Sequence, residues 1–216
     1  MRRPYRDRET AGRALAEEIG PVAGSVLVLG LARGGVLVAA PVADALGAEL
    51  DVLVVRKLGV PWQPELAMGA IAGVGEELYL VRNEPVAAGV DPDAIEAVRR
   101  SEERELRRRE STYRGDRPPI DVRDRAVVLV DDGLATGTTM RAAVDAVRRQ
   151  RPAQVIAAVP VGSTTSCRGL RADRVVCPWF PQYFTAVGQA YRDFSEVSDD
   201  QVRRVLAEST ARRPGR

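Results

Sequence analysis

The sequence predicts an α/β protein: a doubly wound, mostly parallel sheet with helices on both of its faces. Short apolar runs rich in valine and leucine alternate along the chain with segments that have helical spacing. The apolar runs lack polar alternation, which is typical of strands buried on both faces. Glycine, proline and charged residues separate these runs from their neighbours. Because ligands of such sheets bind at the carboxyl ends of the strands, a functional site is expected at that edge.

In the first half of the chain, helical and strand-like segments alternate before a long loop. The predicted elements are, in order, a helix over residues 11–19, a strand over 25–30, a helix over 36–46 and a strand over 50–55. Gly47 ends the second helix, as glycine often does. Residues 59–75 are rich in glycine and proline and are expected to form a long loop, with a short hairpin that continues to residue 81 as an option.

A charged helix opens the second half, and shorter strand–helix units follow it. Opposite charges four residues apart, such as Glu103 and Arg107, support this helix. The predicted elements are a helix over 93–113, a strand over 126–130, a helix over 138–149, a strand over 154–160, a short helix over 163–170, a strand over 174–177 and a closing helix over 199–208.

These elements define a core and its appendages. Residues 1–24 are expected to form a flank or part of a hood, and residues 209–216 a disordered tail. The core spans residues 25–176, and residues 177–208 form the irregular, aromatic-rich remainder of the hood and the closing helix.

The composition is that of a globular protein of 216 residues, with 45% hydrophobic and 29% charged residues. The net charge of +2 argues against a dedicated nucleic-acid-binding role. The absence of histidine excludes a Ser-His-Asp triad and any zinc site ligated by histidine. Cys167 and Cys177 lack metal-ligand spacing, and no apolar run suits a signal peptide or a membrane span. A reduced, cytoplasmic protein is therefore expected.

Residues 127–140 (VVLVDDGLATGTTM) carry the most specific functional pattern. The strand delivers Asp131 and Asp132 to the carboxyl edge of the sheet, and a loop of small and hydroxyl residues leads straight into a helix. Unpaired N–H groups at a helix start bind phosphate, and glycine lets the backbone approach a ligand. Two adjacent carboxylates can accept hydrogen bonds from vicinal hydroxyls. The pattern predicts a site for a sugar phosphate.

The run VLVDDGLATGTT resembles the phosphoribosyl pyrophosphate (PRPP) signature of type I phosphoribosyltransferases, which implies the fold of that family with a small irregular hood. The resemblance implies that Asp131 and Asp132 are catalytic, hold the ribose hydroxyls and bind the cofactor Mg²⁺ through water or ribose oxygens. Gly133 and Ala135 depart from the residues most common in the family. The implied 5′-phosphate-binding residues are Ala135, Thr136, Gly137, Thr138 and Thr139.

Two further segments resemble pyrophosphate-binding loops of the same family. LGLARGGVLVAAPVA places Arg33, Gly34 and Gly35 after the first strand, where a plain tight turn is the alternative interpretation. LDVLVVRKLGVP places Arg56 and Lys57, the only lysine, after the next strand, where two solvated charges are the alternative. The resemblance implies that these five residues hold pyrophosphate and that residues 57–81 form a lid over the site.

The segment CPWFPQYFTAVGQAYRDFSEV resembles the base-binding hood of hypoxanthine-type members. Trp179, Phe180 and Phe184 could stack on a base, or they could anchor the hood to the core. The hypoxanthine-type pattern reads the purine 6-oxo group with a lysine, and this sequence has no lysine in the hood. The identity of the base is therefore open.

The whole chain is most similar to a group of bacterial predicted phosphoribosyltransferases without an assigned substrate, which share RGGV, VRKLG and DDGLATG segments with it. The resemblance implies transfer of a 5-phosphoribosyl group from PRPP to a small nitrogenous base, and a homodimer. The apolar runs and the nearly balanced charge argue against a membrane or nucleic-acid partner. A PRPP or nucleotide sensor on the same fold is the first alternative. A hydrolase or phosphorylase of a ribose phosphate is the second.

Overall fold

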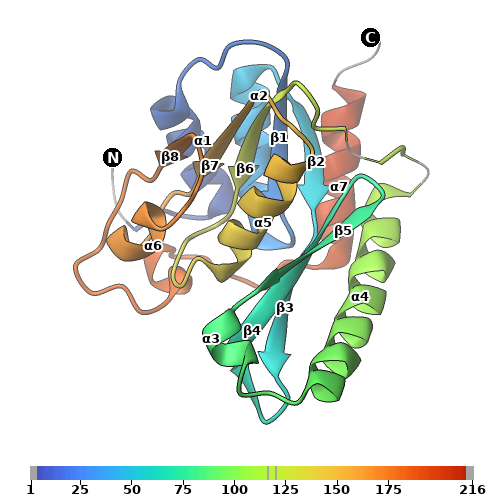
Figure 1. The fold of residues 1–216 in the computed structure, drawn as a ribbon. Coiled ribbons are helices and arrows are strands. Elements are labelled where there is room, and N and C mark those ends of the chain that lie inside the picture. The colour runs from blue at the N-terminus through green and yellow to red at the C-terminus, as the bar shows by residue number, and fades with distance from the viewer. Residues whose placement is uncertain (1–3, 116, 120, 213–216) are drawn as a thin grey trace.

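In the computed structural model, which describes residues 4–115, 117–119 and 121–212, five parallel strands form a central sheet in the order β2-β1-β6-β7-β8 (Figure 1). The strands of the chain are β1 (Val26–Leu31), β2 (Glu49–Leu53), β3 (Val55–Val60), β4 (Gln63–Val74), β5 (Glu77–Arg82), β6 (Ala126–Val130), β7 (Gln154–Ala158) and β8 (Arg174–Val176). The helices are α1 (Arg8–Ile19), α2 (Gly34–Leu46), α3 (Glu84–Ala87), α4 (Pro92–Arg114), α5 (Thr138–Arg149), α6 (Thr164–Arg168) and α7 (Asp199–Ala211), with one 3-10 helix, η1 (Val187–Ala190). This arrangement confirms the predicted α/β class with a mostly parallel sheet.

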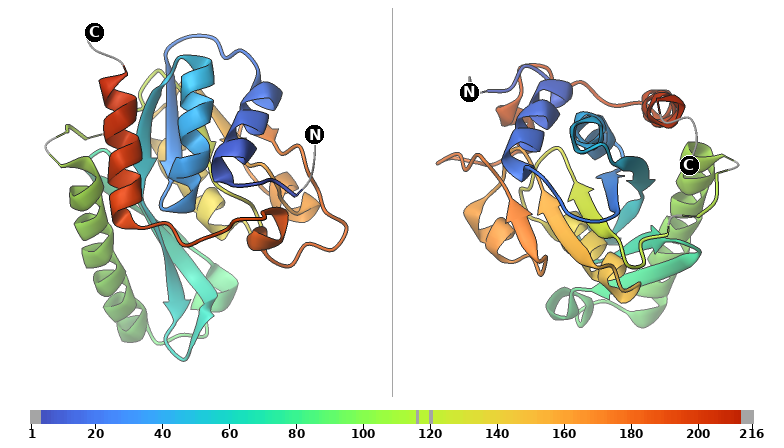
Figure 2. Two further views of the ribbon diagram at one scale, coloured as in Figure 1. Left: turned by 180° about the vertical axis from the view of Figure 1, so that it is seen from behind. Right: turned by 90° about the horizontal axis from the view of Figure 1, so that it is seen from above.

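Helices cover both faces of the five-stranded sheet (Figure 2). One core cluster joins α1, α2 and α7 to the face that carries Val28, Val128 and Ile156. The other joins α5 to the face that carries Leu29 and Leu129. The central strands β1 and β6 are apolar and buried on both faces, as their missing polar alternation predicts.

The prediction of a long loop over residues 59–75 is wrong, whereas the hairpin expected to continue to residue 81 is present as β4 and β5. Most of these residues belong to β3 and β4, which pair antiparallel with each other, and β4 then pairs antiparallel with β5. This small sheet follows β2 after the single residue Val54, and its β3–β4 hairpin extends away from the five-stranded sheet (Figure 1). The implied lid segment, residues 57–81, is therefore built of strands.

The charged helix is confirmed as α4, which packs against the small sheet and α7. The prediction of a disordered tail is wrong for its first residues, because α7 continues to Ala211 and Arg212 forms an ion pair with Asp44 (Nη2–Oδ2 3.3 Å). Residues 213–216 of that tail lie outside the described residues. No helix in the described ranges is long and apolar enough to span a membrane.

Candidate active site

The carboxyl ends of β1, β2 and β6 meet at one edge of the sheet. The Ala32 N–H at the end of β1 donates to the Leu53 carbonyl at the end of β2 (3.1 Å). On the other side of β1, the register pairs Gly30 with Val130, the last residue of β6. The topology thus brings the segments after all three strands together, which is where the predicted catalytic and pyrophosphate-binding residues lie.

The carboxylates of Asp131 and Asp132 have different partners. The Asp131 Oδ1 atom accepts a hydrogen bond from the Asp132 N–H (2.8 Å). The Asp132 Oδ2 atom accepts one from the Arg8 Nε–H (2.9 Å), and the two side chains of this ion pair are only 15% and 10% exposed. Asp132 therefore has a buried cationic partner, whereas Asp131 bonds to the backbone.

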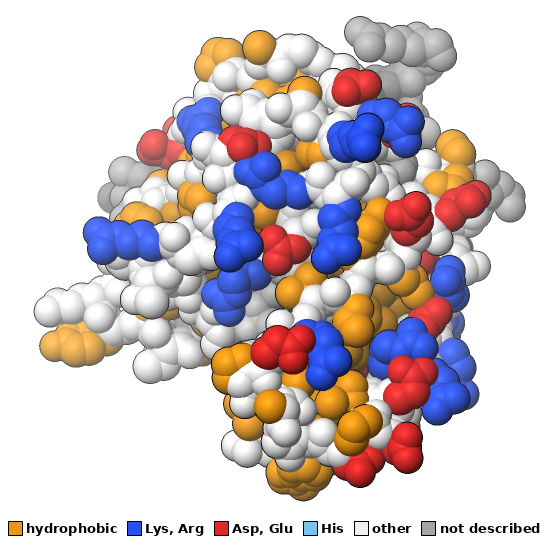
Figure 3. Space-filling model, viewed as in Figure 1, with side chains coloured by type: hydrophobic (Ala, Val, Ile, Leu, Met, Phe, Trp, Pro, Cys, Tyr) orange, Lys and Arg blue, Asp and Glu red, His pale blue; other side chains and the backbone are white. Residues whose placement is uncertain are grey.

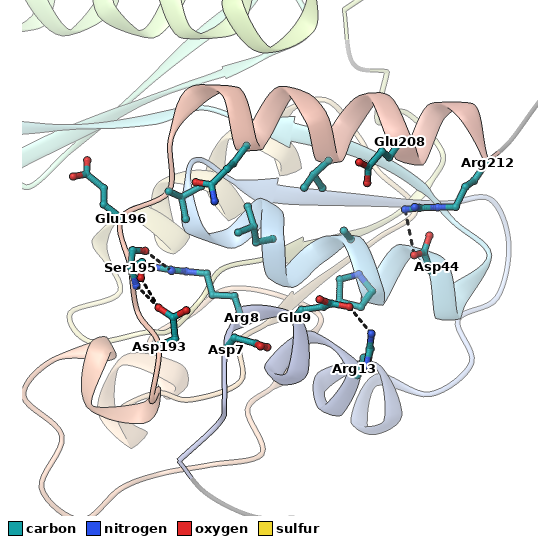
Figure 4. Close-up of a pocket in the computed structure, with 16 residues that line it drawn as sticks. Asp7, Arg8, Glu9, Arg13, Asp44, Asp193, Ser195, Glu196, Glu208 and Arg212 are labelled. Carbon is teal, nitrogen blue, oxygen red and sulfur yellow. Dashed lines mark hydrogen bonds and ion pairs between the residues drawn. The ribbon is translucent and has the colours of Figure 1, made fainter.

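Arg8 is a site residue that the sequence analysis missed. Besides Asp132, its guanidinium donates from Nη1 to the Ser195 carbonyl (2.9 Å) and lies 4.0 Å from the centroid of the Phe194 ring. Figure 4 shows Arg8 beside Ser195 at one end of a cavity of about 600 Å³ among α1, α2 and α7. Neither Asp131 nor Asp132 lines this cavity. Arg8 therefore lies between the cavity and the Asp131–Asp132 pair. No local signal could reveal Arg8, because 124 residues separate it from Asp132.

Burial and mutual repulsion make the carboxylate pair hard to ionise. Burial raises the pKa of Asp131 well above its ordinary value, and the negative charge of Asp132 raises it further. Burial also raises the pKa of Asp132, but the Arg8 guanidinium opposes this rise. Asp132 is thus the member of the pair that ionises more readily.

The loop before α5 and the first residues of that helix are the segment predicted to bind phosphate, called the cradle from here on. The N-cap residue of α5 is Gly137, which has a φ of 77° and no side chain, so the N-cap offers no side-chain acceptor to the N–H groups of the first turn. Two hydrogen bonds fix the loop that precedes α5. The Ala135 carbonyl accepts them from the hydroxyls of Ser163 (3.2 Å) and Ser166 (2.6 Å). Thr136 is exposed, and Thr138 and Thr139 are half-buried.

Arg141, one turn into α5, is a second residue that the sequence analysis did not select. Its Nη1 atom lies 3.1 Å from the point where a Cβ atom on Gly137 would be, and its Nη2 atom lies 3.5 Å from the Thr138 hydroxyl. A guanidinium therefore adjoins the cradle. The helical spacing from Gly137 to Arg141 is a signal that could have indicated this residue.

The start of α2 lies against the carboxylate pair. A Cβ atom on Gly35 would lie 2.6 Å from the Val130 carbonyl oxygen and 2.9 Å from the Cα atom of Asp131, and one on Gly34 would overlap the Asp132 carboxylate. Only glycine lets α2 begin this close to β6. The α2 start also has no side-chain cap, so it offers a second set of N–H groups.

The three cationic side chains of the predicted pyrophosphate site are engaged in ion pairs. Arg33 Nη2 lies 2.5 Å from Glu196 Oε1, and Arg56 Nη2 lies 2.6 Å from Glu102 Oε2. Lys57 Nζ lies 3.1 Å from Glu65 Oε2 on the adjacent strand. These pairs are partly exposed, and exposed pairs are weak enough for a phosphate ligand to replace the carboxylate.

The hood contacts the carboxylate loop directly. The Tyr191 hydroxyl donates to the Asp132 carbonyl (2.6 Å), and a Cβ atom on Gly133 would lie 2.5 Å from a Val187 methyl group. The unusual glycine at position 133 therefore makes room for η1. The contact also places the hood next to the predicted ribose site.

The three aromatic residues predicted to bind the base differ in their surroundings. Trp179 packs edge-on against Tyr5, with ring centroids 5.9 Å apart, and Phe184 packs against the same small cluster. Phe180 is 47% exposed. Packing accounts for Trp179 and Phe184, and the Phe180 ring is open to a ligand.

The described residues contain no group of three histidine, cysteine or acidic side chains that could enclose a metal ion. The carboxylates of Asp131 and Asp132 are nevertheless the oxygen donors that Mg²⁺ prefers. Two carboxylates suit a cation that takes its remaining ligands from water and a phosphorylated substrate.

Known proteins share this chain's sequence and fold. A protein of Mycobacterium tuberculosis, whose name marks it as a provisional phosphoribosyl transferase, is 48% identical over 203 residues, which are 92% of this chain and 45% of that protein. This chain thus spans less than half the length of that relative. The crystal structure of TT1426 from Thermus thermophilus is 44% identical and superposes with a TM-score of 0.79, covering 96% of this chain and 99% of TT1426.

A shorter match joins 57 residues, 26% of this chain, to the bifunctional protein PyrR of Pediococcus pentosaceus at 47% identity. The model of the phosphoribosyl transferase domain matches residues 8–184, a range that includes Arg8, both glycines of the α2 start and the complete cradle. With the carboxylate pair, the two uncapped helix starts and this match in agreement, the chain belongs to the phosphoribosyl transferase domain family.

Proposed function

We propose that this protein transfers the 5-phosphoribosyl group of PRPP to a nitrogenous base and releases pyrophosphate. The observation that carries the proposal is the junction of β6 and α5, where an acidic pair lies directly before an uncapped helix start. A ribose 5-phosphate offers vicinal hydroxyls to carboxylates and a phosphate to N–H groups. No other pair of strand end and helix start in the described chain combines both features.

Under this proposal, Asp131 and Asp132 accept hydrogen bonds from the ribose hydroxyls, and their charge stabilises the positive charge that develops at ribose C1. The N–H groups at the start of α5 and the hydroxyls of Thr136, Thr138 and Thr139 bind the 5′-phosphate. Arg8 is assigned the role of a positioning residue, because its Nε–H holds the Asp132 carboxylate.

Pyrophosphate is bound by the backbone N–H groups of Gly34 and Gly35 and by three cationic side chains. Arg33, Arg56 and Lys57 each exchange a carboxylate partner for a phosphate oxygen. Mg²⁺, held by Asp131 and Asp132 directly or through water, would neutralise charge on the departing pyrophosphate. The β3–β4 hairpin carries Trp62 at its exposed tip and is the segment that would exclude water from the reaction.

The proposal is tested by incubating the protein with PRPP and Mg²⁺ and measuring pyrophosphate release across a panel of purine, pyrimidine and other nitrogenous bases. Release that depends on one base supports transfer and identifies the substrate. Release that needs no base indicates a hydrolase. PRPP binding without release for any base would favour a PRPP sensor instead. The proposed homodimer is checked separately by light scattering.

A further inference from the structure

A polar groove of about 400 Å³ adjoins the 5′-phosphate cradle on the face of the molecule that carries α5. It lies between the first half of α5, the middle of β4 with the end of β5, and the segment that follows α6. Its polar side chains are Arg82, Asn83, Thr138, Arg141, Asp145 and Arg171.

The lining of this groove is strongly basic, with three guanidinium groups and one carboxylate. Arg82 is bound to Glu84 (Nε–Oε1 3.3 Å), but none of the ion pairs found within the described ranges involves Arg141 or Arg171. Figure 3 shows arginine and lysine side chains gathered over this face, although the whole chain carries a net charge of only +2. The groove is therefore suited to an anion.

The groove is continuous with the cradle. Thr138 belongs to both, and the Arg141 guanidinium lies between the Gly137–Thr138 backbone and Gly169, whose added Cβ atom would be 3.9 Å from Nη1. Arg141 therefore adjoins both the cradle and the groove, and the exposed Arg171 lines the groove with it. PRPP has one phosphate on its 5′ carbon and leaves this space unused.

We propose that the groove binds a second phosphoryl group joined to the 5′-phosphate, so that nucleoside 5′-diphosphates occupy the PRPP site and compete with PRPP. The inference rests on the proposed function for the placement of the ribose and the first phosphate. The planar guanidinium forks of Arg141 and Arg171 match phosphate oxygens and supply charge-assisted hydrogen bonds to the added group. The protein is thus inhibited by the charged products of nucleotide phosphorylation.

The test compares dissociation constants of nucleoside 5′-monophosphates and 5′-diphosphates of adenosine, guanosine, cytidine and uridine, measured by calorimetry at fixed free Mg²⁺. For at least one base, the diphosphate binds about 10-fold more tightly than the monophosphate, as expected for charge-assisted bonds to one phosphate. Arg171→Gln brings this ratio close to one. Arg168→Gln is the matched control, because Arg168 is exposed on α6, does not line the groove and loses the same charge.

Equal affinities of the two ligands in the wild-type protein, or no binding of any diphosphate, would overturn the inference. So would a ratio that survives Arg171→Gln, since the second phosphate would then lie elsewhere, for example at the pyrophosphate loop. PRPP titrated in the same series separates the two proposals. A protein that binds PRPP without the diphosphate preference refutes only this inference. One that does not bind PRPP refutes the proposed function and, with it, the competition that this inference requires.

Discussion

The starts of α2 and α5 are built alike but differ in how their charges are balanced. Both helices begin without a side-chain cap, and both lie at the carboxyl edge of the central sheet. At α2, the Arg33 guanidinium is bound to Glu196 and lies 4.0 Å from Asp199. At α5, Arg141 has no carboxylate partner among the described residues and lies beside the cradle.

This difference indicates that the two phosphate sites are prepared to different degrees. The α5 cradle presents its N–H groups and a guanidinium without any competing anion, so it is ready for a phosphate. The α2 site must first release Arg33 from the segment between the hood and α7. The proposed function therefore predicts that pyrophosphate binding is coupled to that segment and that 5′-phosphate binding is not.

The largest effect is expected for Asp132→Asn. The neutral amide still accepts a hydrogen bond from Arg8, so the protein should remain folded, but it no longer stabilises positive charge at ribose C1. PRPP affinity should fall, and pyrophosphate release should decrease about 100- to 1000-fold. Calorimetry, a release assay and a thermal melt measure the three quantities. If the variant unfolds while the wild type does not, the carboxylate pair is structural.

A second large effect is expected for Arg8→Met, now on stability. The substitution leaves the buried Asp132 carboxylate without its cation and should lower the free energy of unfolding by about 3 kcal/mol. Arg13→Met is the control on the same helix, because the Arg13–Glu9 pair is exposed and contributes less than about 1 kcal/mol. Urea unfolding measures both. An equal decrease in the free energy of unfolding for both variants would mean that the buried Arg8–Asp132 pair contributes no more to stability than the exposed Arg13–Glu9 pair.

A smaller effect tests the unequal preparation of the two sites. Glu196→Gln removes the partner that competes for Arg33, so the affinity for inorganic pyrophosphate should rise about 2- to 5-fold, as expected for a largely exposed pair. Glu208→Gln removes the same charge from α7 without breaking an ion pair found in the described residues. An unchanged or weaker affinity in the Glu196 variant, measured by calorimetry, would contradict the proposed competition.

The smallest effect concerns Tyr113, which links α4 to the charges around Arg33. Its hydroxyl donates to Asp199 (2.6 Å), and burial together with this bond raises the pKa of Tyr113 from 10.0 to about 12. Because the folded-state pKa is raised, the stabilisation is complete below pH 10 and is lost as the pH rises through 12. The stability advantage of wild type over Tyr113→Phe, about 1 kcal/mol at neutral pH, should vanish over this range in urea-unfolding measurements. A constant difference would refute the link.

The parallel sheet and the strand–loop–helix unit that contains the proposed cradle could be predicted from the sequence because their signals are local. The strand over 126–130 and the helix over 138–149 have the predicted bounds, since a β-branched run and a glycine–threonine boundary define them. The Asp131–Asp132 pair then follows from its position directly after the strand.

The small sheet and Arg8 could not be predicted, for different physical reasons. Glycines in β3 and β4 suggested turns, but they permit close approach: a Cβ atom on Gly69 would lie 2.6 Å from the Val81 carbonyl oxygen of β5. Packing against α4 and α5 then stabilises strands that are weak by composition. Arg8 reaches Asp132 only because α1 packs on α2. The two residues are 124 positions apart, so no local sequence pattern includes both of them.

The central claim is that the loop from Asp131 to Thr139 holds ribose and its 5′-phosphate. The most direct measurement is a crystal structure of the protein with ribose 5-phosphate, which carries both groups and nothing else. The account predicts the phosphate at the N–H groups of Gly137, Thr138 and Thr139 and the ring hydroxyls at the two carboxylates. A ligand bound elsewhere, or no ligand at saturating concentration, would contradict it.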